Sequence, residues 1–241
     1  YADSIAPAGT ADWNSHKPDN NATGLARLAH DGGTVLLVYG AIGSINYAHS
    51  ISAGLPNIGI DQLEAEWEGC EIASGAFYDY TQIAVYDGRP MFAFQLKSGG
   101  YNDLNFGYAD GITSTDWTVF SVDATEPNSG NTVRMVLDSV GRPCLAYQNI
   151  DITSYLRFAH ATTATPASSS DFDRITVWQA SQTHIGNWLG LGLYDNRPLM
   201  SFVNTGSAAE EGLQMACATT EAPAGNGDFD IAITDPGGTY F

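Results

Sequence analysis

The hydrophobic positions of this chain occur in short runs separated by loops rich in Gly, Ser, Thr, Asn and Pro. Residues 117–122 and 132–137 are typical, because they combine β-branched, aromatic and alternating polar positions over the length of a strand. No stretch carries a 3.6-residue apolar period with helix-capping residues at its ends. The pattern therefore predicts an all-β protein built from many short strands.

The runs recur with a fixed turn sequence. Arg-Pro pairs begin at Arg89, Arg142 and Arg197, which are 53 and 55 residues apart, and a degenerate copy of the turn occupies residues 30–34. An Asp-Gly or Asp-Asn pair precedes two of the arginines, and these residues tolerate positive φ. Each turn is therefore expected to join two antiparallel strands in a tight hairpin, with the proline near the start of the second strand.

Two further signals follow each turn. The first is an aromatic residue or Met followed by Ala, at Tyr1-Ala2, Tyr47-Ala48, Tyr108-Ala109, Phe158-Ala159 and Met215-Ala216. The second is an acidic residue before a large aromatic one, at Asp12-Trp13, Glu66-Trp67, Asp116-Trp117, Asp171-Phe172 and Asp228-Phe229. Four strands in each period of 50–57 residues predict a β-propeller of four-stranded antiparallel blades, with the aromatic residues packed between blades.

About five blades are visible in one β-propeller domain that covers residues 1–241. Four complete blades are expected near residues 24–74, 75–130, 131–186 and 187–235. Residues 1–20 and 236–241 then belong to a further blade. Either the two ends share it, or the sequence is a segment of a longer propeller. The second alternative is favoured, because a chain that ends in mid-strand leaves an unpaired edge.

One repeat resembles a known kind of blade. The pattern Asp-x-x-Gly-Arg-Pro-x-x-Ala-Tyr at Asp138 to Tyr147, followed by Leu156 to Ala159, resembles the repeats of secreted bacterial and archaeal propellers grouped with sialidase-like, or BNR-like, proteins. The resemblance implies a propeller fold and leaves function open, because propellers host many activities. The Asp-box of true sialidases, the WD signature and the repeated kelch double glycine are all missing from the sequence.

The charge balance limits the partners. The chain has 27 acidic and nine basic residues among 241, a net charge of −18. No basic stripe is available to neutralise phosphates, so we expect no nucleic-acid partner and no anionic membrane surface. No apolar run reaches the length of a transmembrane helix. A surface rich in uncharged polar residues instead predicts an extracellular or cell-surface protein that binds a glycan or a protein, with self-association as a further alternative.

The repeated arginines are the candidate ligand-binding residues. Arg89, Arg142 and Arg197 occupy the same place in successive blades, and a ring of guanidinium groups could hold a carboxylate in bidentate fashion. Sialidase-like enzymes use an arginine triad in this general way. The architectural alternative is favoured, in which each arginine pairs with an acidic neighbour or stacks on an aromatic ring.

No cofactor or metal is expected. The residues after the aromatic-Ala pairs could ligate a metal, but as equivalent positions they should lie one per blade: Asp3, His49, Asp110, His160 and Cys217. A calcium-dependent propeller remains a further alternative. Cys70, Cys144 and Cys217 show no zinc-site spacing and are expected to be free thiols, with one disulfide plus a spare thiol as the alternative.

Other candidates carry weaker signals. Carboxylate pairs that glycosidase chemistry could use occur at Glu64/Glu66, Asp171/Asp173 and Asp228/Asp230, although Asp171 and Asp228 are expected to be turn residues. Tyr78, Tyr80 and Tyr101 are expected in loop-like segments, where they pack under loops or stack on sugars. Asn21 begins a glycosylation sequon, which matters only in a secreted protein.

These observations favour a non-catalytic extracellular propeller that binds glycan or protein, or assembles into a surface structure or fibre. The alternative is a glycan-active enzyme of sialidase-like or lyase type, with arginines and carboxylates at a central cleft. No catalytic residues are assigned, because no nucleophile elbow or Ser/His/Asp grouping is present in the sequence.

Overall fold

The computed structural model describes residues 22–51, 67–98, 101–124, 129–150, 154–179, 185–204 and 212–236. These residues form four antiparallel sheets of four strands each. The first two sheets contain β1 (Ala22–Asp31), β2 (Thr34–Ala41), β3 (Ser44–Ser50), β4 (Trp67–Ser74), β5 (Ala76–Tyr86), β6 (Arg89–Ser98), β7 (Tyr101–Ala109) and β8 (Trp117–Asp123). The last two contain β9 (Ser129–Leu137), β10 (Pro143–Ile150), β11 (Ser154–Ala161), β12 (Phe172–Gln179), β13 (Ile185–Tyr194), β14 (Arg197–Asn204), β15 (Gly212–Ala218) and β16 (Phe229–Pro236).

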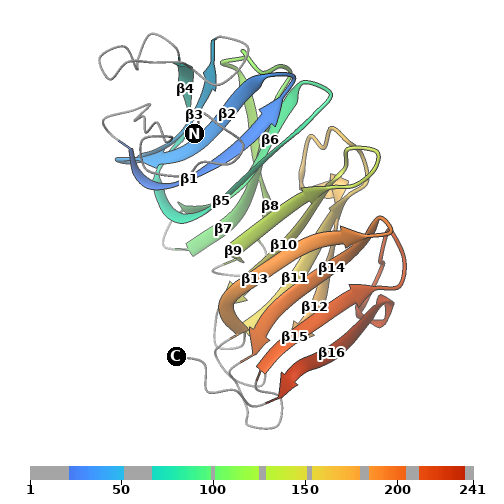
Figure 1. Cartoon of the computed structure of the whole chain (residues 1–241). Coiled ribbons are helices and arrows are strands. Elements are labelled where there is room, and N and C mark those ends of the chain that lie inside the picture. Colours follow the sequence, from blue (N-terminus) through green and yellow to red (C-terminus); the bar gives the residue numbers. More distant parts are fainter. Residues whose placement is uncertain are drawn as a thin grey trace, which may run out of the picture.

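The four sheets are the blades of a β-propeller. In each sheet the strands are hydrogen-bonded in sequence order, and the first strand contacts the first strand of the next sheet. β1, β5, β9 and β13 therefore lie along the inner side, and the sheets follow one another in an arc (Figure 1). This arrangement confirms the predicted fold class.

The four sheets span residues 22–74, 76–123, 129–179 and 185–236, whereas the blades were expected near 24–74, 75–130, 131–186 and 187–235. Pro236, which was expected to start another blade, is instead the last residue of β16. The segments expected to make a further blade, 1–20 and 237–241, lie outside the described residues.

The β5–β6 and β13–β14 hairpins follow the predicted turn chemistry, whereas the β9–β10 turn spans residues 138–142 and is wider than the tight hairpin expected. Asp87 and Gly88 have φ of 51° and 70°, and Asp195 and Asn196 have φ of 49° and 59°. Such left-handed pairs form the two-residue turns whose twist matches that of paired strands. The four hairpins that join the first strand to the second all lie at one end of the blades. We call this the turn end; the opposite end, where β8 leads to β9, is the linker end.

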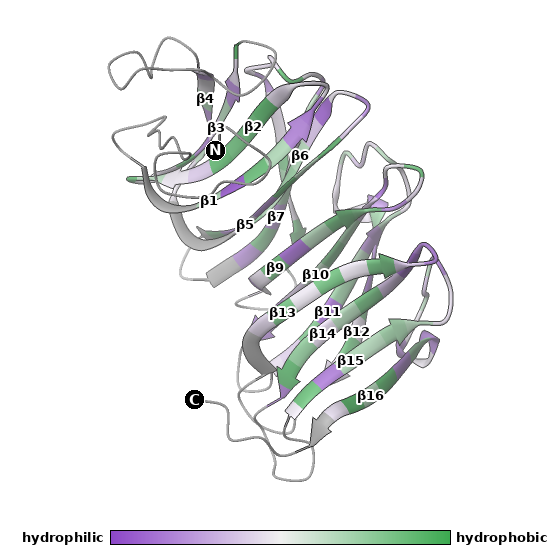
Figure 2. Ribbon diagram, viewed as in Figure 1, coloured by the Kyte–Doolittle hydropathy of each residue, from purple (hydrophilic) through white to green (hydrophobic). Residues whose placement is uncertain are grey.

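The apolar cores lie between blades. One cluster joins residues of the third and fourth sheets, a second joins the second and third, and a third joins the first and second. Hydrophobic residues follow the strands, whereas the turns are more hydrophilic (Figure 2).

In the second, third and fourth described blades, the aromatic residue of the acid-aromatic pair opens the fourth strand and packs against the preceding blade. The ring centroids are 4.9 Å apart for Trp117 and Tyr47, 5.5 Å for Phe172 and Phe106, and 5.8 Å for Phe229 and Phe158. Aromatic pairs at these distances add stabilisation beyond the burial of their area. The predicted packing layer between blades is therefore present at all three of these junctions.

The strand register corrects the repeat alignment in the second blade. Tyr108 pairs with Met91, as His160 pairs with Cys144 and Cys217 with Leu199. Tyr108 is thus the equivalent of His49, His160 and Cys217, and the expectation that Asp110 fills this place is wrong. The sequence alignment matched Tyr108-Ala109, whereas the structural match is Phe106-Gly107.

A second correction concerns three tyrosines. Tyr78 and Tyr80 lie within β5 and Tyr101 opens β7, so none of them is in a loop. Within the described part of the chain, no helix is long and apolar enough to cross a membrane.

Candidate functional site

The three arginines of the repeated turn are each bound within their own blade. Arg89 pairs with Asp110 at 3.1 Å and lies over the ring of Tyr108. Arg197 pairs with Asp195 at 3.8 Å. The guanidinium groups therefore have separate carboxylate partners, which fits the architectural alternative better than a shared clamp.

Arg142 belongs to a buried hydrogen-bond network around Asp138. The Nε of Arg142 donates to Oδ2 at 2.6 Å, and the backbone N–H groups of Arg142 and Val140 donate to Oδ1 at 2.8 and 3.0 Å. His160 Nε2 lies 3.2 Å from Oδ2. Burial alone would raise the pKa of Asp138, but these hydrogen bonds together outweigh it, so the pKa is lowered and the carboxylate stays charged. The network stabilises the wider turn of the third blade.

The arginine of the second blade also lines a cavity of about 230 Å³ at the turn end. The cavity lies where the β5–β6 hairpin meets the loop between β11 and β12, with Tyr86, Asp87, Asp110 and Thr165 among its lining residues. Among the three predicted binding residues, Arg89 is thus the one that borders a described cavity.

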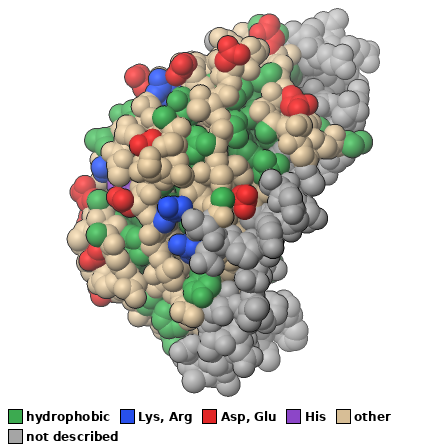
Figure 3. Space-filling view, turned by 180° about the vertical axis from the view of Figure 1, so that it is seen from behind, with side chains coloured by type: hydrophobic (Ala, Val, Ile, Leu, Met, Phe, Trp, Pro, Cys, Tyr) green, Lys and Arg blue, Asp and Glu red, His purple; other side chains and the backbone are tan. Residues whose placement is uncertain are grey.

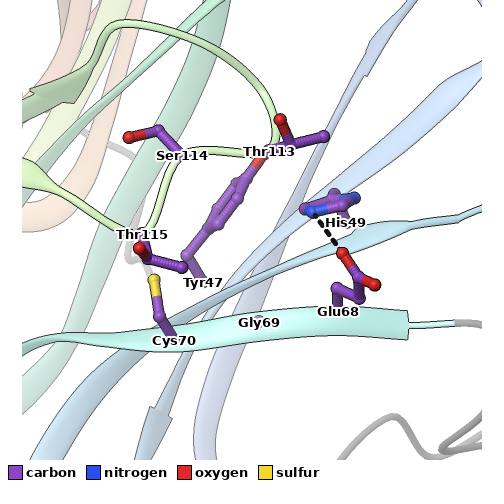
Figure 4. Close-up of a pocket in the computed structure, with 8 residues that line it drawn as sticks. All are labelled: Tyr47, His49, Glu68, Gly69, Cys70, Thr113, Ser114 and Thr115. Carbon is purple, nitrogen blue, oxygen red and sulfur yellow. Dashed lines mark ion pairs between the residues drawn. The ribbon is translucent and has the colours of Figure 1, made fainter.

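A second cavity of about 230 Å³ lies between the first and second blades. Figure 4 shows His49 and Glu68 at one side and Cys70 at the other, with Tyr47 between them and the loop residues 113–115 opposite. His49 Nε2 is 3.8 Å from Glu68 Oε2, close enough for an ion pair when the imidazole is protonated. Carboxylate, imidazole and hydroxyl groups together suit a polyhydroxyl ligand.

Neither Cys70 nor Tyr47 is an activated nucleophile in this cavity. Burial raises the pKa of the Cys70 thiol, and burial also raises that of the Tyr47 phenol well above its usual range. The phenol donates a hydrogen bond to the carbonyl of Ile112 at 2.8 Å, which anchors the loop of the second blade to the first. The cavity is therefore suited to binding, not to nucleophilic catalysis by these two groups.

A charged network joins the second and third blades toward the linker end. Asp123 is fully buried; Tyr147 Oη donates to its Oδ2 at 2.8 Å, and Arg157 and Arg174 lie 3.2 and 3.8 Å from its carboxylate oxygens. Arg174 also donates to the carbonyl of Val122 at 3.1 Å. Because the three partners come from successive strands of the third blade, the network fixes that blade against the end of β8. The sequence did not reveal this network, since Asp123, Arg157 and Arg174 do not belong to the repeat.

Buried polar residues continue this network along the linker end. Gln95 donates to the carbonyl of Ser129 at 3.1 Å, and the Ser129 hydroxyl bonds to the carbonyl of Asp123 and to the N–H of Leu104. Asn149, fully buried and paired with Ser129 in the sheet, finds no hydrogen-bond partner for its side-chain amide among the described residues. Such groups usually face a polar partner or a ligand.

Asp103 is the described carboxyl group with a raised pKa. Burial is the larger cause, and the negative charge of Asp123 adds to it. A general acid that cleaves a glycosidic bond must keep its proton near the working pH. The raised pKa lets Asp103 hold a proton to higher pH than usual.

The remaining predicted residues have local roles. Asp171 and Asp228 each accept backbone hydrogen bonds that close a short 3₁₀ turn before β12 and β16, as expected.

Cys70, Cys144 and Cys217 are free, and only Cys144 is fully buried. In the described ranges, no three His, Cys, Asp or Glu side chains are grouped to hold a metal ion. Asp3, Asn21, Glu64 and Glu66 lie outside those ranges. Acidic side chains are scattered over the face seen in Figure 3.

No protein-family model matches the chain, and no curated protein matches it in sequence. Its fold is similar to that of a thermostable family-43 glycoside hydrolase, with a TM-score of 0.52 and 12% identity over 90% of this chain and 75% of that one. It is also similar to an α-L-arabinofuranosidase from Lactobacillus brevis, with a TM-score of 0.53 and 10% identity over 87% and 72% of the two chains. At such identities the likeness establishes the propeller fold, and the relatives in fold are glycoside hydrolases.

Proposed function

We propose that this protein acts on glycans as a glycoside hydrolase. The observation that carries the proposal is the match of fold, over 87–90% of the chain, to two proteins described as a glycoside hydrolase and an arabinofuranosidase. The polar cavities at the turn end and the buried polar network at the linker end support a polyhydroxyl substrate. The acidic, polar surface supports an extracellular or cell-surface location, where such substrates occur.

In this proposal Asp103 is the candidate proton donor, because its pKa is raised and a general acid must keep its proton near the working pH. The protein is assayed on a panel of nitrophenyl glycosides that includes α-L-arabinofuranoside and β-D-xyloside, and on arabinan and xylan. Turnover is expected on at least one substrate, and Asp103→Asn should lower it roughly a hundredfold or more. Asp230→Asn, at an exposed strand position, is the matched control and should keep full activity.

Non-catalytic glycan binding is the second candidate. The cavity of Figure 4 favours it, because among its lining residues Glu68 is the one carboxylate, whereas hydrolysis requires two. Saturable binding of a polysaccharide without release of reducing ends would establish this candidate over the first. An absence of both turnover and binding across the panel would overturn both.

A further inference from the structure

The geometry points to a binding subsite for one neutral sugar ring in the cavity between the second and third blades, at the turn end. The inference rests on the proposed function in taking a glycan as the ligand. At about 230 Å³ the cavity is smaller than the roughly 300–1,000 Å³ of pockets for drug-sized ligands, so it fits a single ring rather than an oligosaccharide. It lies at the end of the blades opposite Asp103 and the Asp123 network.

Tyr86 provides the apolar wall of this subsite. Tyr86 is 40% exposed, and its ring lies against Gly141 in the turn of the third blade. At the equivalent Tyr194 of the fourth blade, the guanidinium carbon of Arg197 lies 5.6 Å from the ring centroid, so one face of that ring already has a cation beside it. In the second blade Arg89 lies over Tyr108 instead, at 5.7 Å. The Tyr86 ring is consequently free of a guanidinium group and can stack against the C–H face of a sugar.

The charges around the cavity select a neutral ligand. Arg89 is paired with Asp110, and Asp87 adds a second carboxylate, so the site carries a net negative charge. A uronate or sialate would be repelled, which is the opposite of a carboxylate clamp. Asp110 is 83% exposed on its side chain and can accept hydrogen bonds from sugar hydroxyls, while Arg89 donates.

The far wall of the cavity is already ordered. Thr165 belongs to the loop between β11 and β12, and Asp171 closes that loop by accepting the N–H groups of Ala167 and Ser168 at 2.8 and 3.0 Å. The N–H of Thr162 donates to the carbonyl of Asp171 at 2.8 Å. A wall held by its own hydrogen bonds loses little entropy when a ligand binds.

The test is a titration of the ¹⁵N-labelled protein with arabinotriose, xylotriose and, as the anionic comparison, a trigalacturonate. Binding of a neutral trisaccharide should shift the backbone amide signals of Asp87, Asp110 and Thr165 and leave those of Asp195 and Asn196 in place. Tyr86→Ala should weaken this binding roughly tenfold, and Asp110→Asn, an exposed substitution that leaves the core intact, should weaken it severalfold. Tyr194→Ala is the matched control, since it removes a tyrosine from the same place in another blade.

Hydrolytic activity is measured on all three variants. If the wild type turns over glycans but Tyr86→Ala and Asp110→Asn bind them like the wild type, the subsite is refuted and the proposed function stands. Equal loss in Tyr86→Ala and Tyr194→Ala, or tighter binding of the trigalacturonate than of the neutral sugars, also refutes it. If no glycan in either panel is bound or cleaved, both the subsite and the proposed function fail.

Discussion

Arg142 Nε donates a hydrogen bond to Asp138 Oδ2 at 2.6 Å. The Asp138 side chain is only 2% exposed, and its carboxylate also accepts hydrogen bonds from two backbone N–H groups. An arginine bound in this way is part of the frame of the third blade. It is therefore not available to clamp a ligand carboxylate without exposing its partner.

Arg142→Ala is expected to reduce stability and leave glycan binding and turnover unchanged. Removing the guanidinium leaves a buried carboxylate with one fewer charge-assisted hydrogen bond, at a cost of about 1.5–3 kcal/mol. Urea unfolding gives the stability, and the glycan assays give the activity. Arg197→Ala is the control, because Arg197 pairs with an exposed carboxylate at 3.8 Å and should cost less than about 1 kcal/mol. Loss of binding in folded Arg142→Ala protein would revive the clamp interpretation.

The lowered pKa of Asp138 predicts an acid-sensitive contribution to stability. The unfolded-state pKa of Asp is about 3.9, and the folded-state value lies below it. The contribution is therefore fully present above pH 4 and is lost as the pH falls through the folded-state pKa. The difference in unfolding free energy between wild type and Asp138→Asn should be constant from pH 5 to 7 and shrink below pH 4. A difference that stays constant down to pH 2 would contradict this assignment.

The aromatic contacts between blades should be strongly coupled. Phe158 is fully buried and packs on Phe229 of the next blade. Phe158→Ala is expected to cost about 3–5 kcal/mol, measured by urea unfolding. A double-mutant cycle with Phe229→Ala should give a coupling of about 0.5–1.5 kcal/mol. Additive effects within error would indicate that the two rings do not interact.

Gly141 should be replaceable only at high cost. Its φ is +81°, and a Cβ at this position would overlap the ring of Tyr86. Gly32 also has positive φ, at +54°, but faces open space, so Gly32→Ala isolates the backbone strain of about 1–2 kcal/mol. Gly141→Ala should therefore lower the melting temperature clearly more than Gly32→Ala. Equal effects of the two substitutions would show that the overlap is relieved without cost.

The architecture could be predicted because the repeated residues have the same structural role in successive blades. The turn residues Asp87 and Asp195 adopt the left-handed conformation that their chemistry suggested. Trp117, Phe172 and Phe229 open fourth strands and pack between blades as their recurrence indicated. A residue type that recurs at a fixed interval occupies the same position in the local structure of each blade.

The site was harder to predict for the same reason. Asp123, Arg157 and Arg174 are separated by 34 and 17 residues in the sequence and come together only in space. Asp110 was misplaced because the aromatic-Ala pair of the second blade, Tyr108-Ala109, lies two residues beyond the structurally equivalent Phe106-Gly107. Residues that give one blade a different function differ from the repeat, so they cannot be found by comparing the repeats with one another.

Because the three clusters at the described junctions each draw on two consecutive sheets, most of the hydrophobic interior of a blade is completed by its neighbour. A single blade of about fifty residues is therefore not expected to fold by itself, because it would leave apolar side chains exposed. Unfolding should be cooperative across the blades, although each blade is one local segment of the sequence. Duplication or deletion of a blade during evolution would require a new packed interface between two blades. Sequence variation is therefore expected more often in the loops than in the number of blades.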